Sequence, residues 1–251
     1  MLCLIPYCLL AICYTGRNLD AGFYSGINKA NEIVNLYFIS GLGVDKRVFC
    51  NLTLSPGFSI HYIDWIKPMD KESITNYAKR LCTFIDKTKP FVLIGLSFGG
   101  IMAVEMNRFL QPEKTIIISS AATKNQLPKF IRSIRFMPIY KLLPNQFLKK
   151  ANGLFYWFFG IKTDDEKKLL KQILPDTDID LLKWSIHEIT HWQNETIPSN
   201  LIHIHGDADK LLPIKHTNAN IKIRGGEHFM IHSKASEISK ILNEVITHPQ
   251  L

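Results

Sequence analysis

The sequence predicts an α/β protein: a doubly wound, mostly parallel sheet with an inserted helical cap. Short runs rich in β-branched and apolar residues alternate with stretches of helical periodicity, as in strand–helix–strand units. The run at 115–118 is continuously apolar, which is typical of a strand buried on both faces. The alternation stops between about 122 and 197, where only helical patterns occur. With 251 residues, the chain has room for one large domain with one sizeable insertion.

The first half of the chain contains four strand-like runs and two helical stretches. The β-rich runs are 33–39, 58–65, 91–94 and 115–120. A helix is expected over 71–87, where Ile74, Tyr77 and Leu81 share one face. A second helix is expected over 100–110, directly after the third run. Helices that connect consecutive strands favour a parallel sheet.

The second half divides into the helical segment and a return to strands. Four helices are expected inside 122–197, over 127–143, 146–159, 164–174 and 178–192. Strands at 201–205 and 221–223 and a helix at 234–246 follow. We therefore expect a core formed by 33–121 and 198–251, a helical cap at 122–197, and an apolar N-terminal segment at 1–32 whose role stays open.

Residues Gly95-Leu96-Ser97-Phe98-Gly99 match the pattern G-x-S-x-G between a predicted strand and a predicted helix. A serine on such a sharp turn sits in strained backbone geometry, and the turn lifts its hydroxyl clear of the sheet. Glycines two residues to either side let neighbouring backbone approach without a Cβ clash. Ser97 is therefore the candidate nucleophile, and the Phe98 N–H is free to face a developing oxyanion.

A serine nucleophile needs a base and an orienting acid, and candidates for both follow later strands. The strand at 201–205 leads into Gly206-Asp207-Ala208-Asp209, with Pro213 beyond it. The strand at 221–223 leads into Gly225-Gly226-Glu227-His228-Phe229. We favour Asp209 over Asp207 as the acid because it holds the fourth place of Gly-x-x-Asp. The order Ser97, Asp209, His228 is the one expected for a nucleophile elbow of this kind.

With the turn Gly41-Leu42-Gly43 after the first strand, these motifs make the chain resemble the α/β-hydrolase family, in its esterase-like branch with a helical cap. The resemblance covers about 33–121 and 198–251. It implies that Ser97 attacks a carbonyl, that His228 takes and later returns a proton, and that Asp209 orients His228. It also implies an oxyanion hole formed by the N–H groups of Leu42 and Phe98, next to the turn and elbow glycines Gly41, Gly43, Gly95 and Gly99.

The chain departs from the family pattern in two places. Glu227 stands directly before His228, where the family usually has a glycine or another small residue. This carboxylate could perturb the pKa of the histidine. Fuller members also begin with an additional strand hairpin, which residues 1–32 only doubtfully provide.

One competing motif is present at His187-Glu188-Ile189-Thr190-His191, which matches the zinc-protease pattern H-E-x-x-H on a predicted helix. Glu227 is a candidate third ligand, so a zinc-dependent hydrolase is a remote alternative. An amphipathic cap helix with Trp184, Ile189 and Trp192 facing inward explains the same residues. His203 and His205 alternate on one strand and are interpreted as structural.

Composition limits partners and location. The net charge is +8, but no recognition helix, zinc-finger spacing or RNA-binding signature occurs, which excludes nucleic acid as an expected partner. The five cysteines are odd in number and include no C-x-x-C pair, so a reducing, cytoplasmic location is expected. Residues 1–14 are apolar but too few to span a bilayer. Three interpretations of this segment stay open: a degenerate leader, a segment that packs on the core, and a membrane anchor.

The cap sequence between Lys114 and Lys162 contains no acidic residue and interleaves lysines and arginines with aromatic residues. Membrane contact through this cap or the N-terminal segment is not favoured over a cap with a buried aromatic face and a solvated basic face.

The combined expectation is a serine hydrolase that cleaves a carboxylic ester, or a related acyl bond, of a small and mainly apolar substrate, without metal or organic cofactor. The alternative from another class is a ligand-binding member of the fold without turnover. The sequence does not indicate an oligomeric state.

Overall fold

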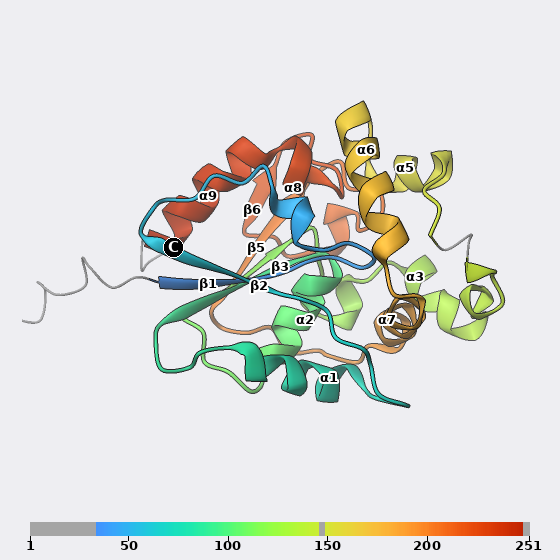
Figure 1. Cartoon of the computed structure of the whole chain (residues 1–251), viewed down its shortest axis with the longest axis horizontal. Coiled ribbons are helices and arrows are strands. Elements are labelled where there is room, and N and C mark those ends of the chain that lie inside the picture. Colours follow the sequence, from blue (N-terminus) through green and yellow to red (C-terminus); the bar gives the residue numbers. More distant parts are fainter. Residues whose placement is uncertain (1–33, 146–148, 248–251) are drawn as a thin grey trace, which may run out of the picture. The chain divides into compact units, whose positions relative to one another are not determined.

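The computed structural model describes residues 34–145 and 149–247 (Figure 1). Their strands form one six-stranded parallel sheet in the order β2-β1-β3-β4-β5-β6. The strands are β1 (Val34–Ile39), β2 (Phe58–Ile63), β3 (Phe91–Leu96), β4 (Lys114–Ile118), β5 (Leu201–Gly206) and β6 (Ile221–Ile223). The chain runs outward from β1 to β2 and then returns past β1 to β3. The strand order therefore reverses at β1, where ligands bind in open parallel sheets.

Helices cover both faces of the sheet, so the predicted doubly wound α/β class is confirmed. The longer helices are α1 (Ile74–Leu81), α2 (Phe98–Met106), α3 (Lys129–Ser133), α5 (Gly153–Phe159), α6 (Asp164–Ile173), α7 (Ile179–His191) and α9 (Ala235–Thr247). A short helix, α8 (Met230–Ser233), precedes α9. In Figure 1, α1 and α2 lie below the sheet and α8 and α9 lie above it.

The strand sequences explain the two layers. In β1, Tyr37 and Ile39 join the core cluster on the α1–α2 side, whereas Leu36 and Phe38 join the cluster on the α9 side. Side chains alternate between faces along a strand, and both faces are covered, so Leu36, Tyr37, Phe38 and Ile39 are all buried and apolar. Asn35 is a buried polar residue of this strand. Helix α2 is buried along its whole length, which accounts for its lack of a polar face.

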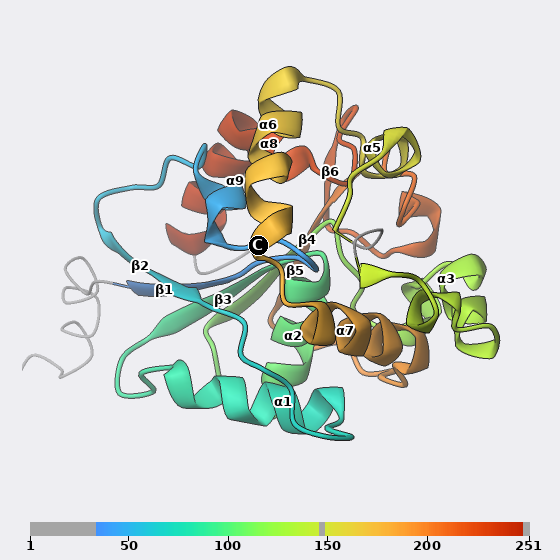
Figure 2. The same cartoon turned by 45° about the vertical axis from the view of Figure 1, so that its right-hand side comes forward.

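The helices between β4 and β5 gather at one end of the sheet, as Figure 2 shows for α3, α5 and α7. The expected helices at 164–174 and 178–192 are confirmed as α6 and α7. Thr163 and Glu166 form a capping box at the start of α6, and Asp178 caps α7. These side chains accept hydrogen bonds from backbone N–H groups of the first helical turn, which have no partner inside the helix.

The expected single helix over 127–143 is wrong. The segment contains α3 and two 3₁₀ turns, Ile134–Phe136 and Ile139–Lys141. Pro138 causes the break, because a residue that precedes proline is driven out of the helical region. Met137 accordingly has φ −136° and ψ 80°. Short pieces in place of one long helix leave room beneath them for the cavity described below.

The predictions for residues 1–32, which include three of the cysteines and any additional hairpin, lie outside the described residues. Part of the helix predicted over 146–159 also lies outside them. Cys50 is exposed and Cys82 is buried, and both are free thiols. Within the described chain, no helix is both long enough and apolar enough to cross a bilayer.

Helix α2 packs directly against the end of β1 through a glycine. A Cβ placed on Gly99 would lie 2.2 Å from the Ile39 carbonyl oxygen and 2.3 Å from that of Ser40. Backbone cannot yield to such a contact as a flexible side chain can. The start of α2 is therefore held at its present distance from β1 only because residue 99 is glycine.

Substituting Gly99→Ala is expected to lower the free energy of unfolding by at least about 2 kcal/mol, since overpacking against backbone forces the two elements apart. Gly57→Ala is the matched control, because a Cβ there meets nothing within 4 Å. Urea denaturation of both variants measures the difference. Equal stabilities for the two variants would contradict this account of the α2–β1 contact.

Candidate active site

Ser97 lies at the turn between β3 and α2, in a backbone conformation that side-chain-bearing residues rarely adopt. Its φ is 51° and its ψ is −116°. Such geometry costs about 1–3 kcal/mol and persists where the surroundings enforce it. Here the Ser97 N–H donates to the Ile118 carbonyl at 2.9 Å, and the Ser120 hydroxyl donates to the Ser97 carbonyl at 2.7 Å. Strand β4 and the residues after it thus hold the turn from one side.

The elbow glycines make the close approach possible. A Cβ on Gly95 would lie 2.3 Å from the Gly99 carbonyl oxygen, so the strand and the helix meet too closely for any other residue. A Cβ on Gly41 would lie 3.4 Å from the Ser97 Cβ, which shows how near the turn after β1 comes to the serine. Gly43 has φ 71°, in the left-handed region that favours glycine.

The structure brings Ser97, His228 and Asp209 together in one hydrogen-bonded chain. Ser97 Oγ lies 2.9 Å from His228 Nε2, and His228 Nδ1 lies 2.8 Å from Asp209 Oδ2. An ionised carboxylate only accepts, so Nδ1 of His228 carries the proton and Nε2 is left to accept from the serine hydroxyl. Asp207 is exposed instead and accepts the Gly225 N–H at 2.6 Å. Asp207 therefore takes no part in the hydrogen bonds that join Ser97, His228 and Asp209.

Asp209 is buried and held by several donors. Its Oδ1 accepts the N–H groups of Leu211 at 2.9 Å and Leu212 at 2.8 Å. Burial alone would raise the pKa of Asp209, but His228 and hydrogen bonds from His205 and the Leu212 N–H lower it well below its usual range. The carboxylate is therefore ionised at neutral pH although solvent does not reach it.

His203 and His205, expected to be structural, lie next to the acid, and the contact of His205 with Asp209 was not predicted. His205 Nε2 lies 2.7 Å from the Leu212 carbonyl oxygen and 3.4 Å from Asp209 Oδ2, and His203 Nε2 lies 3.0 Å from His205 Nδ1. Since the carbonyl only accepts, His205 carries its proton on Nε2. Its Nδ1 then accepts from His203. The signal in the sequence is the four-residue spacing between His205 and Asp209 around the turn after β5.

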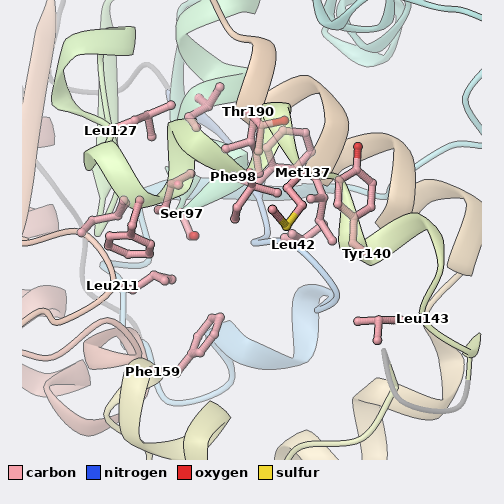
Figure 3. A pocket seen from close by; sticks show the side chains of 17 residues that line it. Leu42, Ser97, Phe98, Leu127, Met137, Tyr140, Leu143, Phe159, Thr190 and Leu211 are labelled. Atoms are coloured by element: carbon pink, nitrogen blue, oxygen red, sulfur yellow. The ribbon is translucent and has the colours of Figure 1, made fainter.

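Leu42 and Phe98, whose N–H groups are the expected oxyanion donors, line the same cavity as Ser97. Phe98 is the first residue of α2, where helical N–H groups lack intrahelical partners and the helix dipole is positive. Leu42 stands in the turn that Val44 N–H closes onto the Gly41 carbonyl. Within 34–145 and 149–247, neither amide donates a hydrogen bond. Both side chains lie near Ser97 in Figure 3.

Glu227, the unexpected carboxylate before His228, forms ion pairs with two lysines. Its oxygens lie 2.8 Å from Lys162 Nζ and 2.8 Å from Lys210 Nζ. Burial would raise the pKa of Glu227, but the hydrogen bonds from Lys162 and Lys210 lower it. Lys162 follows α5, so this ion-pair cluster joins the inserted helices to the loop that carries His228.

An apolar cavity of about 400 Å³ opens beside Ser97 (Figure 3). Almost all of its lining side chains are aliphatic or aromatic, and most come from the inserted helices. They are Leu42, Ser97, Phe98, Ile101, Leu127, Phe130, Ile131, Ile134, Met137, Tyr140, Leu143, Phe159, Ile186, Ile189, Thr190, Leu211 and Leu212. A cavity of this size and lining fits an apolar small molecule.

The H-E-x-x-H residues on α7 have other partners. Glu188 accepts the Ile74 N–H at 2.8 Å, at the start of α1, and burial raises its pKa. His187 Nδ1 lies 3.3 Å from the Tyr140 hydroxyl, and His191 Nδ1 donates to the His187 carbonyl at 2.8 Å. In the described ranges, no three His, Cys, Asp or Glu side chains are placed to hold a metal ion together. The motif belongs to an amphipathic helix that packs through Trp184 and Ile189.

The fold matches that of solved esterase and lipase-esterase related structures. A comparison with protein-family models finds no match, and neither does a sequence comparison with curated proteins. An esterase from Exiguobacterium antarcticum superimposes with a TM-score of 0.67 at 13% identity, covering 87% of this chain and 93% of that one. MenH from S. aureus gives 0.67 at 14% identity, covering 89% and 97%. A lipase-esterase related protein from Clostridium acetobutylicum gives 0.62 at 15% identity, covering 85% and 94%. The described chain thus has the α/β-hydrolase fold.

The buried histidines generate a prediction for stability. Burial, together with the neighbouring His205, lowers the pKa of His203 to about 3. The unfolded chain binds a proton at this residue below about pH 6.5, and the folded chain does not until about pH 3. Stability that is present at neutral pH is therefore lost as the pH falls through this range.

Between pH 7 and pH 5, the wild type is expected to lose about 1–2 kcal/mol more unfolding free energy than His203→Gln, whose side chain does not titrate. Urea denaturation of both proteins across this range checks the difference. Parallel stability curves would show that His203 titrates normally in the folded protein.

Proposed function

We propose that this protein is a serine hydrolase that cleaves a carboxylic ester through an acyl-enzyme. The observation that carries the proposal is the chain of hydrogen bonds from Ser97 through His228 to Asp209, with its serine end at an apolar cavity. The esterase and lipase-esterase related structures that share the fold support the reaction class. Many different reactions occur on one fold, so the fold alone does not set the chemistry and the residues of the site do.

Acylation follows from the geometry. Ser97 Oγ attacks the ester carbonyl carbon while its proton passes to His228 Nε2, 2.9 Å away. The new bond places negative charge on the carbonyl oxygen. His228 then returns the proton to the alcohol oxygen as the carbon–oxygen bond breaks, and the acyl group remains on Ser97. Water repeats the sequence in the second half-reaction, with its proton taken by His228, and releases the carboxylic acid.

The N–H groups of Leu42 and Phe98, which donate no hydrogen bond to any described residue, are suited to bind the oxyanion. Donors that are already in place need no reorganisation when charge develops, and each is worth about 3–4 kcal/mol of transition-state stabilisation. Asp209 stays ionised and holds the proton of His228 on Nδ1, which fixes the tautomer that accepts from Ser97. The oxyanion donors, His228 and Asp209 thus come from different elements of the fold and serve the reaction at one carbonyl carbon.

A ligand-binding protein without turnover is the second candidate, because the apolar cavity alone would serve it. The strained φ of Ser97 and the buried ionised Asp209 argue against it. Binding an apolar ligand needs neither feature, and both cost folding free energy.

Removal of a triad member is expected to reduce kcat for an apolar ester such as methyl hexanoate by about 10⁴-fold or more, measured as acid release. The variants are Ser97→Ala, His228→Ala and Asp209→Asn. Asp207→Asn is the matched control for the last, since Asp207 is two residues away and its carboxylate accepts the Gly225 N–H. Comparable activity of Asp209→Asn and Asp207→Asn would contradict the assigned acid.

A further inference from the structure

Two cavities of very different size meet at Ser97. The larger, of about 400 Å³, does not include His228 in its lining. The smaller, of about 30 Å³, is lined by His228 and extends toward α5 and Gly41. Leu42, Ser97 and Phe159 line both cavities, and of these three Phe159 comes from the inserted helices. In Figure 3 its ring faces the large cavity from the side opposite Met137 and Tyr140.

The chemistry of the proposed function assigns one half of the ester to each cavity. When the bond to the alcohol breaks, His228 Nε2 must protonate the departing oxygen, so the alcohol lies on the His228 side of Ser97. The acyl chain is then directed away from His228. The small cavity therefore receives the alcohol and the large cavity the acyl group.

We infer that the site selects esters of a large apolar acyl group with a small alcohol, and that Phe159 is the residue that limits the size of the alcohol. This inference rests on the proposed function. A space of about 30 Å³ has room for roughly two water-sized groups, whereas the other cavity has room for a chain of several carbons.

Phe159 is held firmly enough to act as a wall. Its carbonyl accepts a hydrogen bond from the Phe229 N–H at 2.9 Å. Its ring packs edge-on against His228, with 5.2 Å between ring centroids, and stacks on Phe155, with 4.2 Å between ring centroids. The next residue, Gly160, has φ 69°, and a Cβ there would lie 2.2 Å from the Glu227 Cβ. Neither the chain after Phe159 nor its ring can move without breaking these contacts.

Glu227 also helps to hold Phe159 against the loop that carries His228. It binds Lys162, just beyond Gly160, and Lys210, whose Nζ also lies 5.0 Å from the Trp157 ring centroid. The ion pairs thus tie both sides of Phe159 to the His228 loop. This gives a reason for a carboxylate at position 227, next to the histidine.

The size of the small cavity also favours water as the second nucleophile. After acylation the alcohol leaves, and the attacking molecule must give its proton to His228 from the same side. A space that admits water but not a long alcohol favours hydrolysis of the acyl-enzyme over transfer to another large alcohol. Bond formation to water oxygen, proton transfer to His228 and release of Ser97 Oγ complete the balance.

The test compares two isomers, methyl hexanoate and pentyl acetate, which have the same atoms but carry the chain on opposite sides of the ester. The wild type is expected to show kcat/KM at least about 10-fold higher for methyl hexanoate, since a few methylenes in the wrong pocket cost this much or more. Phe159→Ala is expected to reduce the ratio below about threefold by improving use of pentyl acetate. Phe159→Leu, which keeps an apolar side chain, is expected to fall between them.

Phe130→Ala is the matched control, because Phe130 lines only the large cavity. This substitution is expected to change kcat/KM for methyl hexanoate and not to raise kcat/KM for pentyl acetate. Equal rates for the two isomers in the wild type, or the same change of ratio in Phe159→Ala and Phe130→Ala, would overturn the assignment while leaving the hydrolase in place. Hydrolysis of neither isomer, together with no covalent labelling of Ser97 by a fluorophosphonate, would overturn the proposed function and the inference with it.

Discussion

The backbone turn at Ser97 is the constraint on which the rest of the site depends. A positive φ at a serine is unfavourable, and three separate elements enforce it: the end of β1 through Gly99, the strand β3 through Gly95, and β4 through the Ile118 carbonyl. Because these strands lie side by side at the reversal of the sheet, the turn is fixed by the core itself. The hydroxyl is thereby placed at the carboxyl end of β3, in the interior of the sheet, and α2 begins at the next residue.

The polar groups around Ser97 form a continuous and mostly satisfied network beneath an apolar cavity. Asp209 accepts from Leu211, Leu212 and His228, and His205 fills the remaining space behind it. Buried polar groups are favourable only when their partners are complete, and then they hold one geometry. His203 is an exception, because its Nδ1 has no hydrogen-bond partner among the described residues. The network positions the acid and the base before any substrate arrives.

Much of the fold could be predicted because its signals are local. The apolar runs of β1, β3 and β4, the cap residues Thr163 and Asp178, and the G-x-S-x-G turn depend on neighbouring residues in the sequence. The candidate triad was predictable because each member follows its own strand. The break at Pro138 was also a local signal, which helical periodicity on either side concealed.

What could not be predicted depends on contacts between distant segments. Glu227 pairs with Lys162 and Lys210, which are 65 and 17 residues away and belong to different parts of the fold, so its position beside His228 suggested a different role. The contact of His205 with Asp209 depends on the turn after β5 folding back. The division of the site into a large and a small cavity depends on where the inserted helices settle, since Phe159 comes from α5 and His228 from the loop after β6.

The central claim is that Ser97 is an activated nucleophile, and covalent labelling tests it most directly. The folded protein is treated with a fluorophosphonate serine probe, its intact mass is measured, and the modified peptide is sequenced. We expect one adduct per chain on Ser97, with no adduct on Ser97→Ala and much slower labelling of His228→Ala. Folded protein that stays unmodified, or an adduct at another serine, would contradict the account.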